Sequence, residues 1–203
     1  MATRRPLVTI AGVIQELPAA DQLRGAKNLP FYIPPTGEDI YTTNGAGGAT
    51  GTVAGAANRI DLFPWVPRGD FTSASLVLNC TTLLAAALAK FVVYGSDLND
   101  RPNALLLETG TVDLSTTGLK PVAGVLSWVN GQTYWLGVRH SSTASISTWL
   151  GTATPDIHAG VLTTAAKKSF RRTLAFATAA PASWVPLSSE VNAALAPAIG
   201  IRM

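Results

Sequence analysis

Short apolar runs rich in β-branched and aromatic residues recur along the chain from residue 58 onward, and each run ends at turn-forming residues. The turns include Pro-Arg-Gly, Asn-Asp-Arg-Pro, Ser-Thr-Thr-Gly and Asn-Gly. Such side chains fit the pleated surface of a sheet, and runs of this length bounded by turns are typical of antiparallel strands. The pattern therefore predicts an all-β fold, an antiparallel β-sandwich. The expected strands cover residues 59–66, 71–80, 88–95, 104–114, 119–128, 133–140, 145–150 and 173–177.

The strongest local turn signal is Asn130-Gly131, because both residues tolerate positive φ. It predicts a hairpin that pairs residues 126–128 with residues 134–136. Residues 133, 135, 137 and 139 alternate with residues 134, 136 and 138 in the second strand. This alternation predicts that one set faces the core and the other faces solvent or a neighbouring chain.

The first thirty residues differ from the rest of the chain. Both faces of the run over residues 7–14 are largely apolar, and no partner strand is evident within the following thirty residues. A strand with two apolar faces is expected to dock on another chain, although a place in the domain's own sheet is the alternative. Pro18 lacks a backbone donor and would end the ladder. The residues expected to make this contact are Leu7, Val8, Ile10, Val13, Ile14, Leu17 and Pro18.

The chain therefore divides into three expected parts. Residues 1–30 form an extended N-terminal arm, and residues 31–57, rich in Gly, Ala and Thr, form a linker or long loop. Residues 58–203 form the β-sandwich domain. The glycines of the middle part complete neither a dinucleotide fingerprint nor a phosphate-binding loop, so no nucleotide cofactor is expected.

Several motifs resemble those of bacteriophage virion-surface proteins. Near the N-terminus they are Glu16-Leu17-Pro18, Asp21 and Gly25-Ala26, and Ala20 stands where that family usually carries Gly. Further along they are the runs Phe-Val-Val-Tyr-Gly-Ser-Asp at 91–97, Arg-Pro-Asn-Ala-Leu-Leu at 101–106, Gly-Thr-Val-Asp-Leu-Ser-Thr-Thr-Gly at 110–118, and Gly-Gln-Thr-Tyr-Trp-Leu-Gly-Val at 131–138.

In their order and spacing these motifs are similar to phage fibre, spike and capsid-decoration proteins, in which an anchoring arm precedes a jelly-roll-like domain. The resemblance implies a non-enzymatic structural protein on the virion surface, synthesised in the host cytoplasm. It also implies a homotrimer bound to capsid, tail or baseplate proteins. Some of the motifs recur in other β-sandwich modules, including carbohydrate-binding ones, so the resemblance informs architecture more than ligand.

Composition agrees with an assembled particle. Charged residues make up 13% of the chain, about half of the roughly 25% that is usual, and a surface with few charges favours association. No apolar run reaches the roughly 18 residues that a membrane span needs, and no secretory signal is evident, so we expect no membrane partner. The single cysteine, Cys80, excludes an intrachain disulfide and is expected to be buried.

No catalytic or metal-binding pattern is evident, and we expect neither a catalytic residue nor a metal. His140 and His158 belong to no zinc-protease motif, and Asp156 lies too close to His158 in sequence to indicate a triad by itself. The stretch from Asp97 to Glu108 lacks the glycine that a calcium loop requires. Asp97 is expected to bind its own backbone in a turn.

Two groups of residues could contact a ligand or partner. The densest positive charge is the cluster Lys167, Lys168, Arg171 and Arg172, but the formal net charge is only +3. Nucleic acid is therefore not the expected partner, and a protein contact or a solvated loop fits better. Among the five tryptophans, Trp149 and Trp184 border loops and could stack on a sugar.

Three functional interpretations remain at the level of sequence. The first is the virion structural protein just described. The alternative is a carbohydrate-binding module of a phage tail fibre that recognises a host surface glycan. The third is a glycan hydrolase or another enzyme, which would depend on Asp156 or His158.

Overall fold

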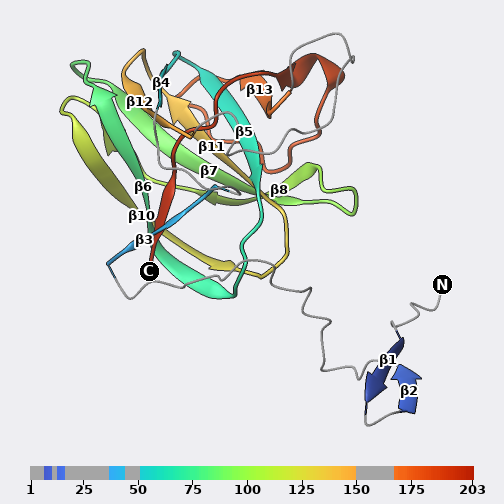
Figure 1. The fold of residues 1–203 in the computed structure, drawn as a ribbon. Helices are drawn as coiled ribbons and strands as arrows, with labels where there is room; N and C mark the ends of the chain where they lie inside the picture. The colour runs from blue at the N-terminus through green and yellow to red at the C-terminus, as the bar shows by residue number, and fades with distance from the viewer. Residues whose placement is uncertain (1–6, 11–12, 17–36, 44–50, 150–166) are drawn as a thin grey trace. The chain divides into compact units, whose positions relative to one another are not determined.

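The computed structural model describes residues 7–10, 13–16, 37–43, 51–149 and 167–203 (Figure 1). The chain divides into two compact units, Met1–Tyr32 and Ile33–Met203. We call the second unit the body.

The described part of the N-terminal unit is a small antiparallel pair of strands, β1 (Leu7–Ile10) and β2 (Val13–Glu16). Their register runs from Leu7 opposite Glu16 to Ile10 opposite Val13. The expectation that the first strand has no partner in the following thirty residues is therefore wrong, because the next segment supplies one. Strand pairing satisfies the backbone groups on one edge of each strand.

The first sheet of the body is built around one long strand, β6 (Phe71–Thr82). One edge of β6 pairs with β10 (Gly118–Trp128), and the other edge is shared by two short strands. β12 (Ser145–Thr148) pairs with one end of this edge and carries β4 (Gly51–Ala54) on its far side. β15 (Gly200–Arg202) pairs with the middle of β6 and carries β3 (Asp39–Tyr41).

The second sheet is built around β7 (Leu88–Ser96). On one edge β7 pairs with β11 (Tyr134–His140), and on the other with β8 (Pro102–Glu108) and the short β9 (Val112–Asp113). β5 (Arg59–Trp65) lies against β11, and the Asn58 N–H donates to the His140 carbonyl at 3.2 Å. β13 (Ser169–Thr173), β14 (Val191–Asn192) and the 3₁₀ turn η2 (Ser188–Glu190) extend this side beyond β5.

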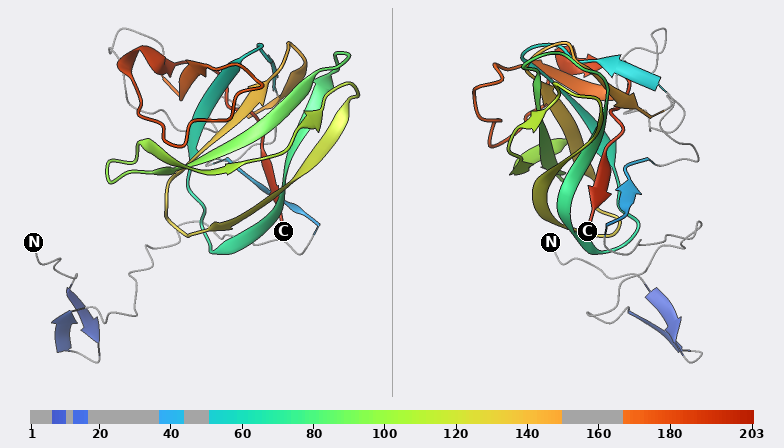
Figure 2. Two further views of the ribbon diagram at one scale, coloured as in Figure 1. Left: turned by 180° about the vertical axis from the view of Figure 1, so that it is seen from behind. Right: turned by 90° about the vertical axis from the view of Figure 1, so that its left-hand side faces the viewer.

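Strands that follow each other in sequence mostly belong to opposite sheets. The row β4-β12-β6-β10 faces the row β5-β11-β7-β8, and only β7 and β8 are consecutive strands within one row. This is the strand order of a jelly roll, which is a sandwich of two interlocked antiparallel sheets. Two further views of the body show the sheets packed face to face (Figure 2). The expected all-β, jelly-roll-like sandwich is confirmed.

A cluster of aromatic side chains lies in the core where β5 and β10 end and β6 and β11 begin. The Trp128 ring, almost fully buried, lies 4.8 Å from Tyr134, 5.4 Å from Trp65 and 6.1 Å from Phe71, measured between ring centroids. Edge-on and offset contacts of this kind add to the stability gained from burying the rings.

The expected hairpin at Asn130-Gly131 is wrong. β10 pairs with β6 and β11 pairs with β7, so this turn carries the chain from one sheet to the other. The local turn chemistry is present, since Gly131 has a φ of +77°. Two hydrogen bonds join this turn to the connection between β5 and β6. The Asn130 N–H donates to Asp70 Oδ1 at 2.7 Å, and the Gly131 N–H donates to the Pro67 carbonyl at 2.9 Å.

The expected alternation of inward and outward residues in β11 is also wrong, because all seven of its residues are buried. A stretch that we call the covering segment, residues 174–187, packs over the outer face of the second sheet. Its Ala180 and Trp184 join a buried cluster that includes residues of β5, β7, β11 and β13. A strand covered on both faces shows no polar side, so period-two patterning fails here.

Hydrogen bonds hold the covering segment in place. At the edge strand β8, the Leu105 N–H donates to the Ala182 carbonyl at 2.9 Å, and the Trp184 N–H donates to the Asn103 carbonyl at 2.7 Å. Arg139, only 1% exposed, forms an ion pair with Glu108 and donates to carbonyls of Ala175, Phe176 and Thr178. A buried guanidinium needs such partners, because an unpaired buried charge is strongly destabilising.

Two of the expected boundaries need correction. Residues 31–57 are not simply a linker, because β3 and β4 lie within them and pair with β15 and β12 of the body. The expected strand at 173–177 is shifted, since β13 ends at Thr173. β3, β4 and β13 are each fixed by backbone pairing with a strand distant in sequence, and none of the three has a strong local pattern.

Candidate binding groove

The structure places the predicted basic cluster at the start of β13, where its two arginines are used internally. Arg171 Nε donates to Asp61 Oδ1 at 2.6 Å, and Arg172 Nε donates to Glu190 Oε1 at 2.5 Å. The Arg172 guanidinium also lies over the Trp184 ring, 4.1 Å from its centroid. Lys167 and Lys168 are partly exposed. The two arginines thus join β13 to its neighbours, and the four residues do not form one open positive surface.

The two predicted ligand-binding tryptophans are buried. Trp184 is 1% exposed and packs edge-on against Tyr94 at 5.6 Å. Trp149 is 3% exposed, and its indole N–H donates to Thr42 Oγ1 at 3.2 Å. Neither ring presents an open face on which a sugar could stack, because the large apolar surface of each ring is covered by the protein itself.

Of the predicted anchoring residues, Leu7, Val8, Ile10, Val13 and Ile14 lie in β1 and β2. Leu17 and Pro18 lie outside the described residues. Docking of this unit on another chain stays a prediction.

The residues weighed for catalysis have structural roles or lie outside the described part. Asp156 and His158 belong to the latter. His140 is buried in β11, where burial and the nearby Arg59 lower its pKa to about 4. Ser141 Oγ accepts the Leu88 N–H at 2.8 Å.

Two smaller expectations are confirmed. Cys80 is buried. Asp97 Oδ1 accepts the backbone N–H groups of Asn99 and Arg101 in a turn. Within the residues that the structure describes, no three His, Cys, Asp or Glu side chains are grouped to hold a metal, and no helix is long and apolar enough to cross a membrane.

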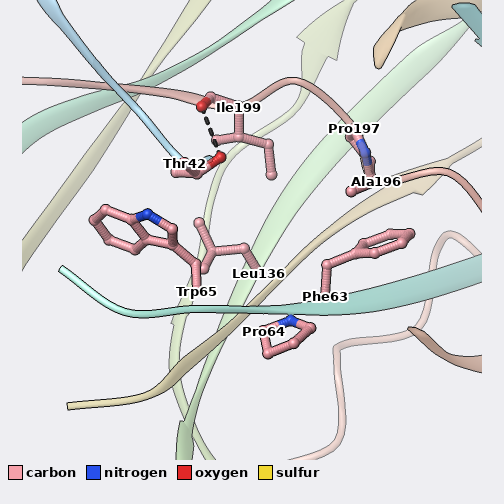
Figure 3. A pocket seen from close by; sticks show the side chains of 8 residues that line it. All are labelled: Thr42, Phe63, Pro64, Trp65, Leu136, Ala196, Pro197 and Ile199. Carbon is pink, nitrogen blue, oxygen red and sulfur yellow. Dashed lines mark hydrogen bonds between the residues drawn. The ribbon is translucent and has the colours of Figure 1, made fainter. Parts of the chain in front are cut away.

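A small cavity lies between β5 and the C-terminal stretch (Figure 3). It is lined by Thr42, Phe63, Pro64, Trp65, Leu136, Ala196, Pro197 and Ile199. Thr42 Oγ1, on its wall, donates to the Ile199 carbonyl at 2.8 Å. The cavity measures about 10 Å³, so it has room for at most about one water molecule and cannot be a ligand site.

A much larger hollow lies on the outer face of the first sheet, and we call it the groove. Strand register explains its position: Tyr41, Gly200, Val77 and Pro121 stand opposite one another on β3, β15, β6 and β10. The next row, which includes Ile40, Ile201 and Leu76, is buried and faces the core.

The rims of the groove are exposed side chains. Tyr41, which is 60% exposed, forms one rim, and its ring centroid lies 5.4 Å from that of Trp149. Leu119, which is 64% exposed, forms the opposite rim. The groove measures about 460 Å³, within the range of roughly 300–1,000 Å³ that is usual for small-molecule sites. It is lined by Asp39, Tyr41, Val77, Leu78, Asn79, Leu119, Ser147, Trp149, Ala198 and Gly200.

Polar groups are placed at two ends of the groove. At one end, Asn79 Nδ2 donates to Ser147 Oγ at 2.9 Å. At the other, the Asp39 carboxylate accepts two hydrogen bonds from Arg202, at 2.8 and 3.3 Å. The carboxylate is therefore neutralised by its own neighbour, and the lining residues that the structure describes carry no unbalanced charge.

Comparison of the chain with protein-family models, with curated proteins and with solved structures gives no match.

No local pattern in the sequence indicates this groove. Tyr41 lies within the Gly-rich stretch that was expected to be a linker, and Asp39 meets Arg202 across 163 positions of sequence. The contributing residues come from β3, β6, β10, β12 and β15, and only the pairing of these strands brings them together. The signal that could have helped is the short run Glu-Asp-Ile-Tyr-Thr at 38–42, where an apolar and an aromatic residue stand beside polar ones.

Proposed function

We propose that the chain is a non-enzymatic structural subunit of a bacteriophage virion, a short fibre, spike or head-decoration protein. In this proposal the N-terminal unit binds a capsid, tail or baseplate protein, and the body projects from the particle surface. The observation that carries the proposal is the division of the chain into a small unit with one strand pair and a separate jelly-roll body.

Three further features support this proposal. Jelly rolls are common in viral capsid and surface proteins, which is an argument by analogy of fold. An isolated two-stranded pair is marginally stable in water, so β1 and β2 would gain from a partner surface. The low share of charged residues, 13%, also favours a chain that buries surface in an assembly.

The proposal is tested by deleting the codons for residues 1–32 from the gene that encodes this chain in the producing phage. The truncated protein should accumulate in infected cells and be missing from purified particles, while the full chain is present in both. A body variant with an exposed substitution, Val185→Ala, serves as the control and should be incorporated normally. Incorporation of the truncated chain at the normal level would refute anchoring by the N-terminal unit.

The homotrimer belongs to the same proposal. Light scattering coupled to size-exclusion chromatography should give three times the mass of one chain. A monomer at micromolar concentration would contradict this part of the proposal and leave the anchoring test unaffected.

The second candidate function is recognition of a host surface glycan. The specific observation in its favour is the groove, which combines an exposed aromatic ring with amide and hydroxyl groups on one face of the body.

A further inference from the structure

We infer that the groove on the outer face of the first sheet binds an uncharged saccharide, with the Tyr41 ring as the stacking surface. The inference deepens the second candidate function above by naming the site and the class of ligand. It is independent of whether the N-terminal unit anchors the chain.

The aromatic rim provides the first argument. Tyr41 leaves 60% of its surface open at the groove. The Trp149 ring lies 5.4 Å away at an interplanar angle of 54° and packs against Tyr41. The face of an aromatic ring carries partial negative charge and attracts the polarised C–H groups on the flat side of a sugar.

The polar end of the groove provides the second argument. Asn79 uses one N–H of its amide on Ser147 Oγ, which leaves its second N–H and its carbonyl oxygen for a ligand. The Ser147 hydroxyl can still donate its proton. A donor and an acceptor beside each other match a sugar hydroxyl, which both donates and accepts.

The charge of the groove lining favours one class of ligand. Among the described lining residues, Asp39 is the charged one, and Arg202 holds its carboxylate through two hydrogen bonds. An anionic ligand, such as a nucleotide or an acidic sugar, would meet no free cation among these described residues. A neutral ligand avoids the cost of burying an unpaired charge.

Backbone pairing disfavours an extended peptide as the occupant. Peptides that bind sheets usually add a strand at a free edge. The floor of the groove is β6, whose edges pair with β10 on one side and with β15 and β12 on the other. A peptide lying there would find no free ladder, whereas a sugar needs only side-chain groups.

The experiment is saturation-transfer NMR of the full chain with glucose, galactose, mannose, N-acetylglucosamine and N-acetylgalactosamine, each as a monosaccharide and a short oligomer. At least one neutral sugar should bind, and Tyr41→Ala should weaken its binding at least tenfold. Tyr41→Phe keeps the ring and should bind within about threefold of the wild type. Val185→Ala, an exposed change outside the groove lining, should bind like the wild type.

A second variant distinguishes loss of sugar binding from loss of folding. Leu119 is 64% exposed, so Leu119→Arg should fold normally and block the opposite rim. It should also weaken binding at least tenfold. The inference is overturned if no neutral sugar binds at millimolar concentration, if only an acidic sugar such as sialic acid binds, or if folded Tyr41→Ala and Leu119→Arg variants bind like the wild type.

Discussion

Gly137 shows how a single residue allows the two faces of β11 to be covered. A Cβ added at this position would lie 2.5 Å from the Asp61 carbonyl oxygen and 2.9 Å from a methyl group of Leu62. The carbonyl belongs to the backbone of β5 and cannot move without shifting that strand. The close approach of β5 and β11 therefore depends on the missing side chain.

We expect Gly137→Ala to destabilise the body by about 1–3 kcal/mol, the range typical of overpacking. Urea unfolding followed by tryptophan fluorescence measures the change. Gly110→Ala is the matched control, because a Cβ there meets nothing within 4 Å. Its stability should stay within about 0.5 kcal/mol of the wild type. Equal effects of the two substitutions would contradict the close packing.

His140 makes the stability of the body dependent on pH. Burial is the largest cause that lowers its pKa to about 4, Arg59 acts in the same direction, and Asp61 opposes the shift. The unfolded chain takes up a proton near the ordinary pKa of about 6.5, whereas the folded chain does so only near pH 4. The stability present above pH 6.5 is therefore lost as the pH falls towards 4.

Replacing His140 with Leu should remove this dependence. Between pH 7 and pH 4, the wild type should lose on the order of 3 kcal/mol more than His140→Leu, with the carboxylate contribution common to both proteins. Unfolding free energies measured in urea at four or five pH values supply the comparison. Parallel pH profiles for the two proteins would show that His140 is not desolvated.

At the scale of elements, the sequence predicted most strands of the body and missed how they pair. Runs of apolar and β-branched residues predicted five strands, and each expected bound lies within two residues of the observed one. The five strands are β5, β6, β7, β10 and β11. Pairing was missed at Asn130-Gly131, because the residues of a turn fix local φ and do not determine which sheet receives the next strand. The groove was missed for the same reason, since register between distant strands creates it.

The covering segment is the element whose role the sequence showed least, and Trp184 is its main anchor. Trp184→Ala removes a ring that is 1% exposed and packs on Tyr94, so we expect a loss of about 3–5 kcal/mol. The variant should also bind a hydrophobic dye, because Val92 and Trp135 become accessible. The neighbouring exposed Val185→Ala should change stability by less than about 0.5 kcal/mol. Dye binding by neither variant would contradict the covering role.

At the scale of the whole molecule, the separation of the two units predicts that the body is stable without the N-terminal unit. All sheet pairings of the body join strands within Ile33–Met203 in the described residues. A chain that begins at Ile33 should therefore unfold in urea within about 0.5 kcal/mol of the full chain, with an unchanged slope against denaturant.

The stability of the shortened chain also decides what its absence from particles would mean. If the shortened chain is as stable as the full chain, its absence from particles reports lost attachment, because degradation of an unfolded body is then ruled out. A loss of more than 1 kcal/mol would mean that residues 1–32 stabilise the body directly. The first unit would then belong to the fold of its own subunit, and β1 and β2 would have less surface to offer a partner.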